Sequence, residues 1–271
     1  MIGFPNAKIN LGLYITSKRS DGYHDIASCF YPVHWEEALE IIPADRFSFS
    51  STGLKVPGDS VSNLVVRAYE LVRKKHNITP CAIHLHKVLP MGAGLGGGSA
   101  DAAVALTLLN DIYQLSLPKE ELIELSTELG SDCAFFIYNT PCLVSSKGEV
   151  LAPINLSLKG YSILLVHPGI HVSTQQAYAG VKPRPLSIDL AQVLTTDPSR
   201  WRDQLINQFE EHLFLQFPEI AAIKQKLYDM GAIYASMSGS GSAVYGLFKD
   251  QESLNRSKWP EHYMTKVIHC P

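Results

Sequence analysis

A glycine-rich segment at residues 90–100, PMGAGLGGGSA, has the composition that most directly indicates chemistry in this sequence. Five glycines fall within the seven positions from 92 to 98, and Ser99 follows them. Ordering such a run costs much backbone conformational entropy, so glycines at these positions indicate that another group must approach the backbone closely. The alanine-rich stretch that follows favours a helix, and consecutive backbone N–H groups at a helix N-terminus bind anions. The segment therefore predicts a loop that holds phosphate, with a flexible turn as the alternative.

Two better-known phosphate-binding motifs fit the segment less well. Gly92, Gly94 and Gly97 form a GxGxxG pattern. A dinucleotide-binding fold also carries an acidic residue about 20 positions later, and that region of this sequence instead indicates a helix. A P-loop needs a lysine directly before the hydroxyl residue, and Gly98 occupies that position. The cation and the base for a phosphoryl transfer must therefore come from elsewhere, and Lys8 and Asp132 are the candidates.

The neighbouring sequence predicts the elements that position this loop. Residues 8–15 alternate between apolar and polar side chains, which is typical of a strand whose polar face carries Lys8, Asn10 and Gly12. A strand at 81–89 leads into the loop, and a helix at 99–113 follows it. The same patterns predict helices at 62–76, 118–129 and 219–230, a strand at 161–168, and two strands joined by a small-residue loop within 232–248.

Composition limits the fold and the partners. The 271 residues, 46% of them hydrophobic, suffice for one or two compact domains, and mixed strands and helices indicate an α/β or α+β fold in two layers. A turn-rich stretch around 147–160 is the candidate boundary between lobes. The net charge of −3 without a dense basic block argues against nucleic acid as a partner. Five cysteines without paired spacing indicate reduced thiols, and no segment reads as a signal peptide or membrane span, so we expect a soluble, cytoplasmic protein with no membrane partner.

Five segments of the sequence together resemble the GHMP kinases. In order along the chain they are AKINLGLYI, RSDGYHDI, the glycine-rich loop, LGSDCAFF and SMSGSGSAVYGLF. The loop alone would fit any GHMP kinase, whereas the first two segments resemble the branch that phosphorylates 4-diphosphocytidyl-2-C-methyl-D-erythritol. The resemblance implies a two-lobed fold of the α+β or α/β class. It implies a nucleotide-binding N-terminal lobe at 1–153 with a left-handed βαβ crossover, a ferredoxin-like C-terminal lobe at 154–271, and an active site between them.

The resemblance also implies a catalytic pair and a nucleotide site. Asp132 would accept the proton of the acceptor hydroxyl, and Lys8 would be the cation. Taken alone, the first would be a residue after a helix end and the second a solvated surface charge. ATP and Mg²⁺ are the implied cofactors, with the Ser99 hydroxyl near the metal ion. The residues implied in nucleotide binding are Pro90, Met91, Gly92, Ala93, Gly94, Leu95, Gly96, Gly97, Gly98, Ser99, Ala100, Lys87 and Asn63.

The implied substrate site begins in the DGYH segment. Tyr23 and His24 would stack on a cytosine ring and hydrogen-bond its edge. An ordinary turn with a core tyrosine is the alternative for this segment. Tyr178 would close the other side of the ring, and another aromatic residue is the alternative there. Asn10 would contact the methylerythritol hydroxyls.

The implied activity is direct phosphoryl transfer from ATP to the 2-hydroxyl of 4-diphosphocytidyl-2-C-methyl-D-erythritol, a step of non-mevalonate isoprenoid synthesis. The alternatives are a related small-alcohol kinase acting on homoserine or a mevalonate derivative, and a non-catalytic nucleotide sensor. A small molecule is the expected partner of a monomer or weak homodimer. Ala93 and the pair Ala100 and Asp101 depart from the residues frequent at these positions in the family, which leaves the adenine contacts open.

Overall fold

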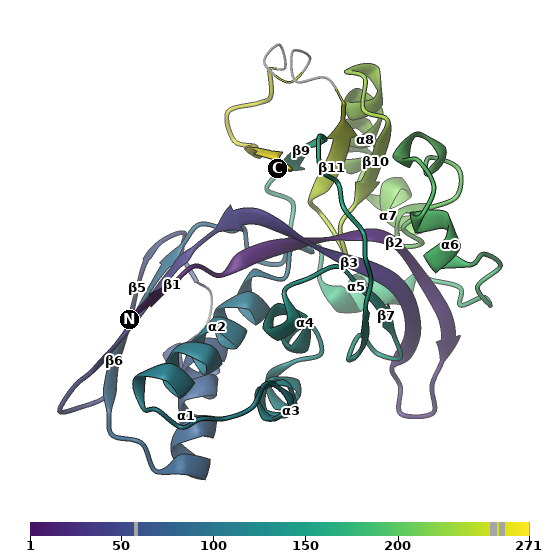
Figure 1. The fold of residues 1–271 in the computed structure, drawn as a ribbon. Coiled ribbons are helices and arrows are strands. Elements are labelled where there is room, and N and C mark those ends of the chain that lie inside the picture. The colour runs from purple at the N-terminus through teal and green to yellow at the C-terminus, as the bar shows by residue number, and fades with distance from the viewer. Residues whose placement is uncertain (57–58, 250–253, 255–257, 271) are drawn as a thin grey trace. The chain divides into compact units, whose positions relative to one another are not determined.

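The computed structural model describes residues 1–56, 59–249, 254 and 258–270. The chain forms two compact units built from alternating segments of the sequence (Figure 1). Unit 1 consists of Met1–Ala7, His34–Met91 and Gly96–Thr140, and unit 2 consists of Lys8–Val33, Gly92–Leu95 and Pro141–Pro271. Each unit is therefore assembled from sequence-distant pieces. The division at residues 153 and 154 stays a prediction.

Unit 1 contains a four-stranded sheet in the order β1-β4-β6-β5. Its strands are β1 (Ile2–Gly3), β4 (Ala38–Pro43), β6 (Cys81–Lys87) and β5 (Ser48–Gly53). Neighbouring strands are antiparallel except β5 and β6, which are parallel and are connected through η1 (Ser60–Ser62) and α1 (Leu64–His76). This connection is a βαβ unit, the kind of crossover that the resemblance implies for the first lobe. The predicted strand at 81–89 is confirmed as β6.

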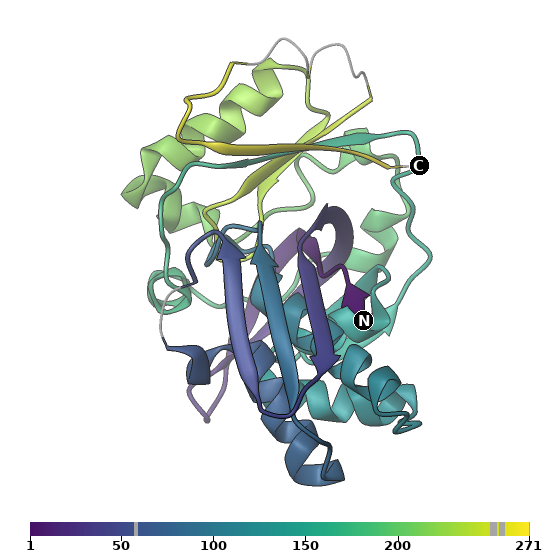
Figure 2. The ribbon, with the colours of Figure 1, turned by 90° about the vertical axis from the view of Figure 1, so that its left-hand side faces the viewer.

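The helices of unit 1 gather on one face of this sheet (Figures 1 and 2). They are α1, α2 (Gly97–Ile112), α3 (Lys119–Leu129) and α4 (Cys133–Tyr138). Their apolar residues and those of the strands form one buried cluster that includes Leu39, Tyr69, Ile83, Leu106 and Leu125. The predicted helices at 62–76, 99–113 and 118–129 are confirmed as α1, α2 and α3, and α4 had no predicted counterpart.

The first part of unit 2 belongs to a sheet in the order β2-β3-β7-β8. Its strands are β2 (Asn6–Lys18), β3 (His24–Glu36), β7 (Cys142–Ser145) and β8 (Val150–Pro153). The strand predicted at 8–15 is confirmed within β2, and both of its faces are buried there. Part of the stretch around 147–160, predicted as turn-rich, forms β8, a short and mostly exposed strand without clear alternation.

The second sheet of unit 2 has the order β10-β11-β9-β12 and is antiparallel throughout. Its strands are β9 (Ser162–His167), β10 (Tyr234–Met237), β11 (Val244–Phe248) and β12 (Met264–His269). In chain order the strands lie 2-3-1-4, which is the arrangement of a ferredoxin-like sheet. Between β9 and β10 the chain forms α5 (Thr174–Ala179), α6 (Leu190–Leu194), η2 (Pro198–Arg200), α7 (Glu210–Gln216) and α8 (Pro218–Asp229). The predicted strands in this region and the helix at 219–230 are confirmed.

Candidate active site

The glycine-rich loop depends on backbone conformations that favour glycine. Gly92, Gly94 and Gly96 have φ angles of 64°, 77° and 74°. A Cβ atom built on Gly94 would lie 1.9 Å from the carbonyl oxygen of Ser238. Part of the reason for the glycines is therefore the close approach of the chain's own backbone. Ala93 is not among the described residues with positive φ, which explains why alanine is accommodated there.

The loop ends at the N-terminus of a long helix. Gly96 precedes α2 without a side-chain cap, and the first helical bond runs from the Ala100 N–H to the Gly96 carbonyl at 2.9 Å. The N–H groups of residues 97–99 therefore have no partner within the helix. Positive partial charge and unpaired donors at this position favour an anion such as phosphate.

Ser99 contacts the segment that carries Asp132. Its hydroxyl lies near enough to the Cys133 thiol to lower the pKa of that thiol, but burial has the larger effect and raises the pKa to about 11. Asp132 is half-buried at the position before α4, and its side chain does not cap that helix. Unit 1 thus brings the predicted metal ligand next to the residue that follows the predicted base.

The hydroxyl oxygen of Ser99, the predicted metal ligand, fits a magnesium ion that is bound mainly through nucleotide phosphates and water. Among the described residues there is no group of three or more His, Cys, Asp and Glu side chains that could hold a metal ion. Mg²⁺ typically uses one or two protein oxygens together with substrate phosphates, so such a cluster is not required.

Lys87 lies inside unit 1 beneath the start of α2. Its side chain is 1% exposed, and its Nζ atom lies 2.6 Å from Glu37 Oε2 and 2.7 Å from Asp101 Oδ2. Glu37 Oε1 also accepts hydrogen bonds from the N–H groups of Val88 and Leu89, at 2.8 and 2.6 Å. The Glu37 carboxylate therefore holds both the lysine and the chain that leads into the loop.

Asp101 completes this buried triad, and sequence reasoning assigned it no role. Its pKa is raised well above the usual value because it is buried, an effect that the Lys87 charge opposes and the Glu37 charge reinforces. One of its oxygens, Oδ1, is buried without a hydrogen-bond partner. A Cβ built on Gly97 would lie 3.2 Å from Lys87 Nζ, so the ammonium reaches the underside of the loop. A direct contact of Lys87 with nucleotide stays a prediction.

Lys8 is not a surface lysine. It is 3% exposed, its Nζ donates to Asn10 Oδ1 at 2.7 Å, and it lies 4.3 Å from the centre of the Phe30 ring. The Asn10 amide in turn donates to the Ser28 hydroxyl at 2.9 Å. The Lys8 N–H donates to the carbonyl of Leu95 at 2.9 Å. The strand that carries the predicted cation is therefore attached to the glycine-rich loop within unit 2.

Two of the predicted cytosine-binding residues contact each other in unit 2. The rings of His24 and Tyr178 are stacked, with centroids 4.9 Å apart and planes 23° apart. This is a direct ring contact that leaves no room for a base between them. Tyr178 also meets the edge of Phe209 at 4.9 Å. Burial, and then the charge of Lys18, lowers the pKa of His24, which favours a neutral imidazole at pH 7.

Tyr23 and Asn63 are placed at local turns. Tyr23 ends a turn that is closed by a hydrogen bond from the Arg19 N–H to the Tyr23 carbonyl at 2.8 Å. The residue is 61% exposed, and Lys147 Nζ lies 5.1 Å from the centre of its ring. Asn63 is the N-cap of α1 and accepts a hydrogen bond from the Val65 N–H at 2.9 Å. This hydrogen bond caps the predicted helix, and a nucleotide contact of Asn63 stays a prediction.

Comparison with known proteins establishes the family. The GHMP kinases N terminal domain matches residues 63–140, and the GHMP kinases C terminal domain matches residues 191–262. A 4-diphosphocytidyl-2-C-methyl-D-erythritol kinase of Cytophaga hutchinsonii is 49% identical over 249 residues, which are 92% of each chain. One from Bacteroides thetaiotaomicron is 48% identical over 263 residues, or 96% of each chain. The chain belongs to the 4-diphosphocytidyl-2-C-methyl-D-erythritol kinase family.

A solved structure supports the fold of this kinase family member over its full length. The crystal structure of a 4-(cytidine 5'-diphospho)-2C-methyl-D-erythritol kinase has a TM-score of 0.85 and 28% sequence identity, and the match covers 100% of both chains. The two-lobed GHMP kinase fold is therefore confirmed, and the protein is an ATP-dependent GHMP kinase. No described helix is long and apolar enough to cross a membrane.

Proposed function

We propose that this kinase transfers the γ-phosphoryl group of ATP to the 2-hydroxyl of 4-diphosphocytidyl-2-C-methyl-D-erythritol, a step of non-mevalonate isoprenoid synthesis. The observation that carries the proposal is 48% to 49% identity to relatives named for this activity, over more than nine-tenths of each chain. The groups proposed for direct transfer are the buried lysine on β2, the glycine-rich loop and the aspartate before α4.

The loop is proposed to bind the nucleotide phosphates. The N–H groups at the start of α2 would donate to their oxygens, and the Ser99 hydroxyl would be a ligand of Mg²⁺. When bound, the metal ion neutralises charge on the phosphates. Lys87 is proposed to lie near the nucleotide beneath Gly97, with its charge balanced by its two carboxylate partners. Asn63 is proposed to lie near the nucleotide.

The transfer itself is proposed to use Asp132 and Lys8. Asp132 would accept the proton of the attacking hydroxyl, which is the role of the aspartate base in other phosphoryl transfers. Lys8 would neutralise charge between the phosphates and the acceptor. Since the ammonium of Lys8 is buried and oriented by Asn10, its charge is fixed in place before the substrate binds. Asn10 is also proposed to contact the methylerythritol hydroxyls.

The cytidine is proposed to bind at Tyr23, His24 and Tyr178. Because His24 and Tyr178 stack directly at 4.9 Å, the base would stack on an outer face of this pair or separate the two rings. Either arrangement uses a neutral His24 imidazole that can donate or accept at the edge of the base.

Turnover of a panel of alcohols tests the proposed function. Purified protein with ATP and magnesium is given 4-diphosphocytidyl-2-C-methyl-D-erythritol, 2-C-methyl-D-erythritol 4-phosphate, homoserine or mevalonate, and ADP formation is measured. We expect turnover with the cytidine-bearing compound and less than about one-hundredth of it with the others, because lost contacts to the base weaken the transition state. Equal turnover with homoserine or mevalonate would overturn the substrate, and ATP binding without turnover would favour a nucleotide sensor.

A further inference from the structure

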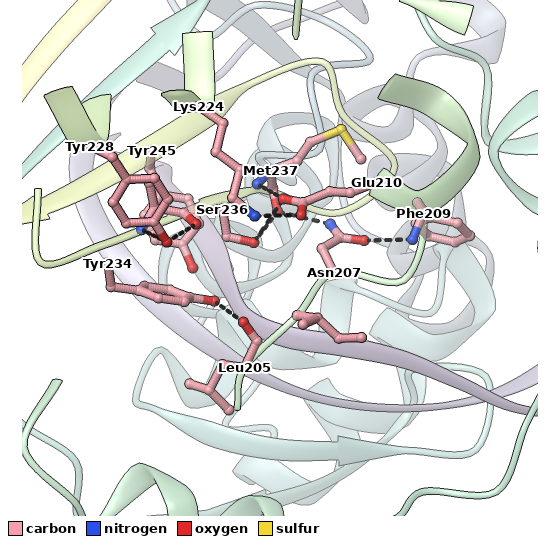
Figure 3. Close-up of polar contacts among 12 residues, drawn as sticks. Leu205, Asn207, Phe209, Glu210, Lys224, Tyr228, Tyr234, Ser236, Met237 and Tyr245 are labelled. Atoms are coloured by element: carbon pink, nitrogen blue, oxygen red, sulfur yellow. Dashed lines mark hydrogen bonds and ion pairs between the residues drawn. The ribbon is translucent and has the colours of Figure 1, made fainter. Parts of the chain in front are cut away.

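A polar cluster in unit 2 holds the end of β10 from two sides. Asn207 and Glu210 are 1% and 8% exposed and lie three positions apart, at the start of α7. Glu210 Oε1 accepts a hydrogen bond from the Met237 N–H at 2.7 Å. Asn207 Nδ2 donates to the carbonyl of Met237 at 2.8 Å (Figure 3). It also donates to the carbonyl of Gly239 at 2.8 Å. We call Asn207 and Glu210 the clasp, because together they bind both backbone groups of Met237.

The clasp is itself fixed by further bonds. Asn207 Oδ1 accepts a hydrogen bond from the Phe209 N–H at 3.0 Å. Glu210 Oε2 pairs with Lys224 Nζ at 2.6 Å, and Glu210 Oε1 also accepts from the Ser236 hydroxyl at 3.2 Å (Figure 3). Since these polar atoms are engaged in the protein interior, the two side chains have little freedom to rearrange.

The residues that the clasp holds lead into the loop at 238–242. The Ser238 hydroxyl donates to the carbonyl of Gly94 at 2.8 Å, and the Ser238 carbonyl occupies the space that a Cβ on Gly94 would need. Beyond the loop, the Ala243 N–H donates to the Ala93 carbonyl at 3.2 Å. The position of Met237 therefore sets the surface on which the first half of the glycine-rich loop rests.

The backbone around Asn207 also holds the strand of the predicted cation. The Leu13 N–H donates to the Ile206 carbonyl, and the Gln208 N–H donates to the Leu13 carbonyl, both at 2.8 Å. These bonds lie on either side of Asn207 and place it beside β2. One short segment thus contacts the strand of Lys8 and Asn10 and the loop that supports Gly94.

We propose that Asn207 is a positioning residue for ATP, which fixes the loop at 238–242 and through it the phosphate-binding conformation of residues 92–95. The proposal rests on the proposed role of the glycine-rich loop in holding phosphates. It concerns no contact of Asn207 with substrate. Its effect should therefore appear in the use of ATP rather than in recognition of the cytidine.

The variant Asn207→Asp separates this role from others. The aspartate keeps the oxygen that accepts a hydrogen bond from the Phe209 N–H, and Phe209 packs on Tyr178. It replaces the Asn207 NH₂ group, which donates to the carbonyls of Met237 and Gly239, by an oxygen that cannot donate to them. We expect the KM for ATP to rise at least ~10-fold, since two buried hydrogen bonds become repulsive contacts. The KM for the cytidine substrate should change less than about twofold, because the His24 and Tyr178 contacts are retained.

Two further variants control the test. Ser238→Ala removes the bond to the Gly94 carbonyl, and it should also raise the KM for ATP. In the double variant with Asn207→Asp, Ser238→Ala should raise the KM for ATP little further, because both substitutions act through the loop at 238–242. Asn110→Asp makes the same chemical change at an asparagine whose two amide atoms bond to the backbone of Leu117 in unit 1, and it should retain the wild-type KM for ATP.

The proposal is overturned if Asn207→Asp keeps the wild-type KM for ATP, if both KM values rise equally, or if the double variant shows fully additive losses. Should Asn207→Asp fail to fold, Ser238→Ala decides, and an unchanged KM for ATP in that variant overturns the proposal. Calorimetric titration with ADP gives the same comparison without turnover. If the wild type binds ADP but does not phosphorylate the cytidine compound, the proposed substrate fails while the clasp remains testable.

Discussion

At the scale of single residues, charged and polar groups that the sequence identified are buried in the structure. Alternation in residues 8–15 assigned Lys8 and Asn10 to a polar face, and the structure buries that face. The buried ammonium of Lys8 is oriented by the Asn10 amide and lies beside the Phe30 ring. A charge held in this way needs no reorganisation when the phosphates arrive, which is the condition for electrostatic stabilisation of a transition state.

Replacement of Asp132 tests the proposed base. Asp132→Ala should lower kcat by ~10²-fold or more, the usual contribution of a general base, while the KM for ATP changes little. Because Asp132 is only half-buried, the apparent Tm should fall by only a few degrees. Steady-state kinetics and thermal unfolding measure the two effects. Asp111→Ala, at an exposed position near the end of α2, is the matched control and should retain the wild-type kcat. A wild-type kcat in Asp132→Ala would refute the role.

Several residues of the site could be predicted individually, but their partners could not. Lys8, Asp132 and the residues predicted to bind cytosine follow from short motifs that resemble those of a known family. Glu37 gave no signal, because it lies 50 positions from Lys87 and only the sheet of unit 1 brings the two together. Asp101 was noticed only as a departure from the family, and its pairing with Lys87 explains what this carboxylate contacts.

At the scale of elements, the glycine-rich loop packs against the chain's own backbone in addition to its proposed role in binding phosphate. Its composition predicted that something approaches the backbone closely, and phosphate was the inferred partner. The structure shows that the Ser238 carbonyl already makes such an approach at Gly94. The loop is therefore a contact between backbone segments of unit 2 that leads directly into the N-terminus of α2.

Two glycine substitutions distinguish positions that need glycine from those that do not. Gly94→Ala requires φ near 77° and a Cβ that overlaps Ser238, so it should lower the free energy of unfolding by about 1–3 kcal/mol. Gly98→Ala lies within α2, and the nearest atom to its Cβ would be 3.7 Å away, so stability should be unchanged or up to about 1 kcal/mol higher. Urea unfolding measures the free energy of unfolding of both variants, and an equal decrease in the two would contradict the geometry.

Elements with strong periodicity were predicted, and those without it were not. The helices α1, α3 and α8 each have an apolar stripe and a clear start or stop signal, such as Asn63, Pro118 or Gly231. The strand β5, SFSSTG, is mostly exposed, so its sequence carries little apolar alternation. The helix α4, CAFFIY, is a short apolar run, and at this length such a run is compatible with either a helix or a strand. Sheet pairing decides such cases, and local sequence does not report it.

At the scale of the whole molecule, the two units do not follow the order of the sequence. The chain passes from one to the other at residues 7–8, 33–34, 91–92, 95–96 and 140–141. Consequently the family motifs read in order along the sequence do not correspond to two successive folded pieces. The resemblance predicted two lobes, while the assembly of each unit from several segments required the coordinates.

Fragments cut at the predicted lobe boundary test this arrangement. A fragment of residues 154–271 lacks β2 and β3, so it loses the partners of Ile206 and Gln208 and the carbonyl of Asn10 to which the Tyr245 hydroxyl donates. We expect no cooperative thermal transition from this fragment, and partial recovery when it is co-expressed with residues 1–153. Calorimetry measures the thermal transition, and amide NMR spectra show whether the fragment is folded. A cooperative transition from residues 154–271 alone would show that the segment folds independently.

The distribution of buried thiols allows the opening of each unit to be followed by thiol alkylation. Cys81 and Cys133 lie in unit 1, Cys29 and Cys142 lie in unit 2, and all four are fully buried. Burial raises the pKa of both Cys81 and Cys133 to about 11, so thiolate, the reactive form, is scarce at neutral pH even when reagent arrives. Once the partly exposed Cys270 has been blocked, alkylation of the remaining thiols requires opening of the unit that contains them. Mass-spectrometric timing of the two pairs would therefore report the opening of each unit separately, in the native sequence and without an attached dye.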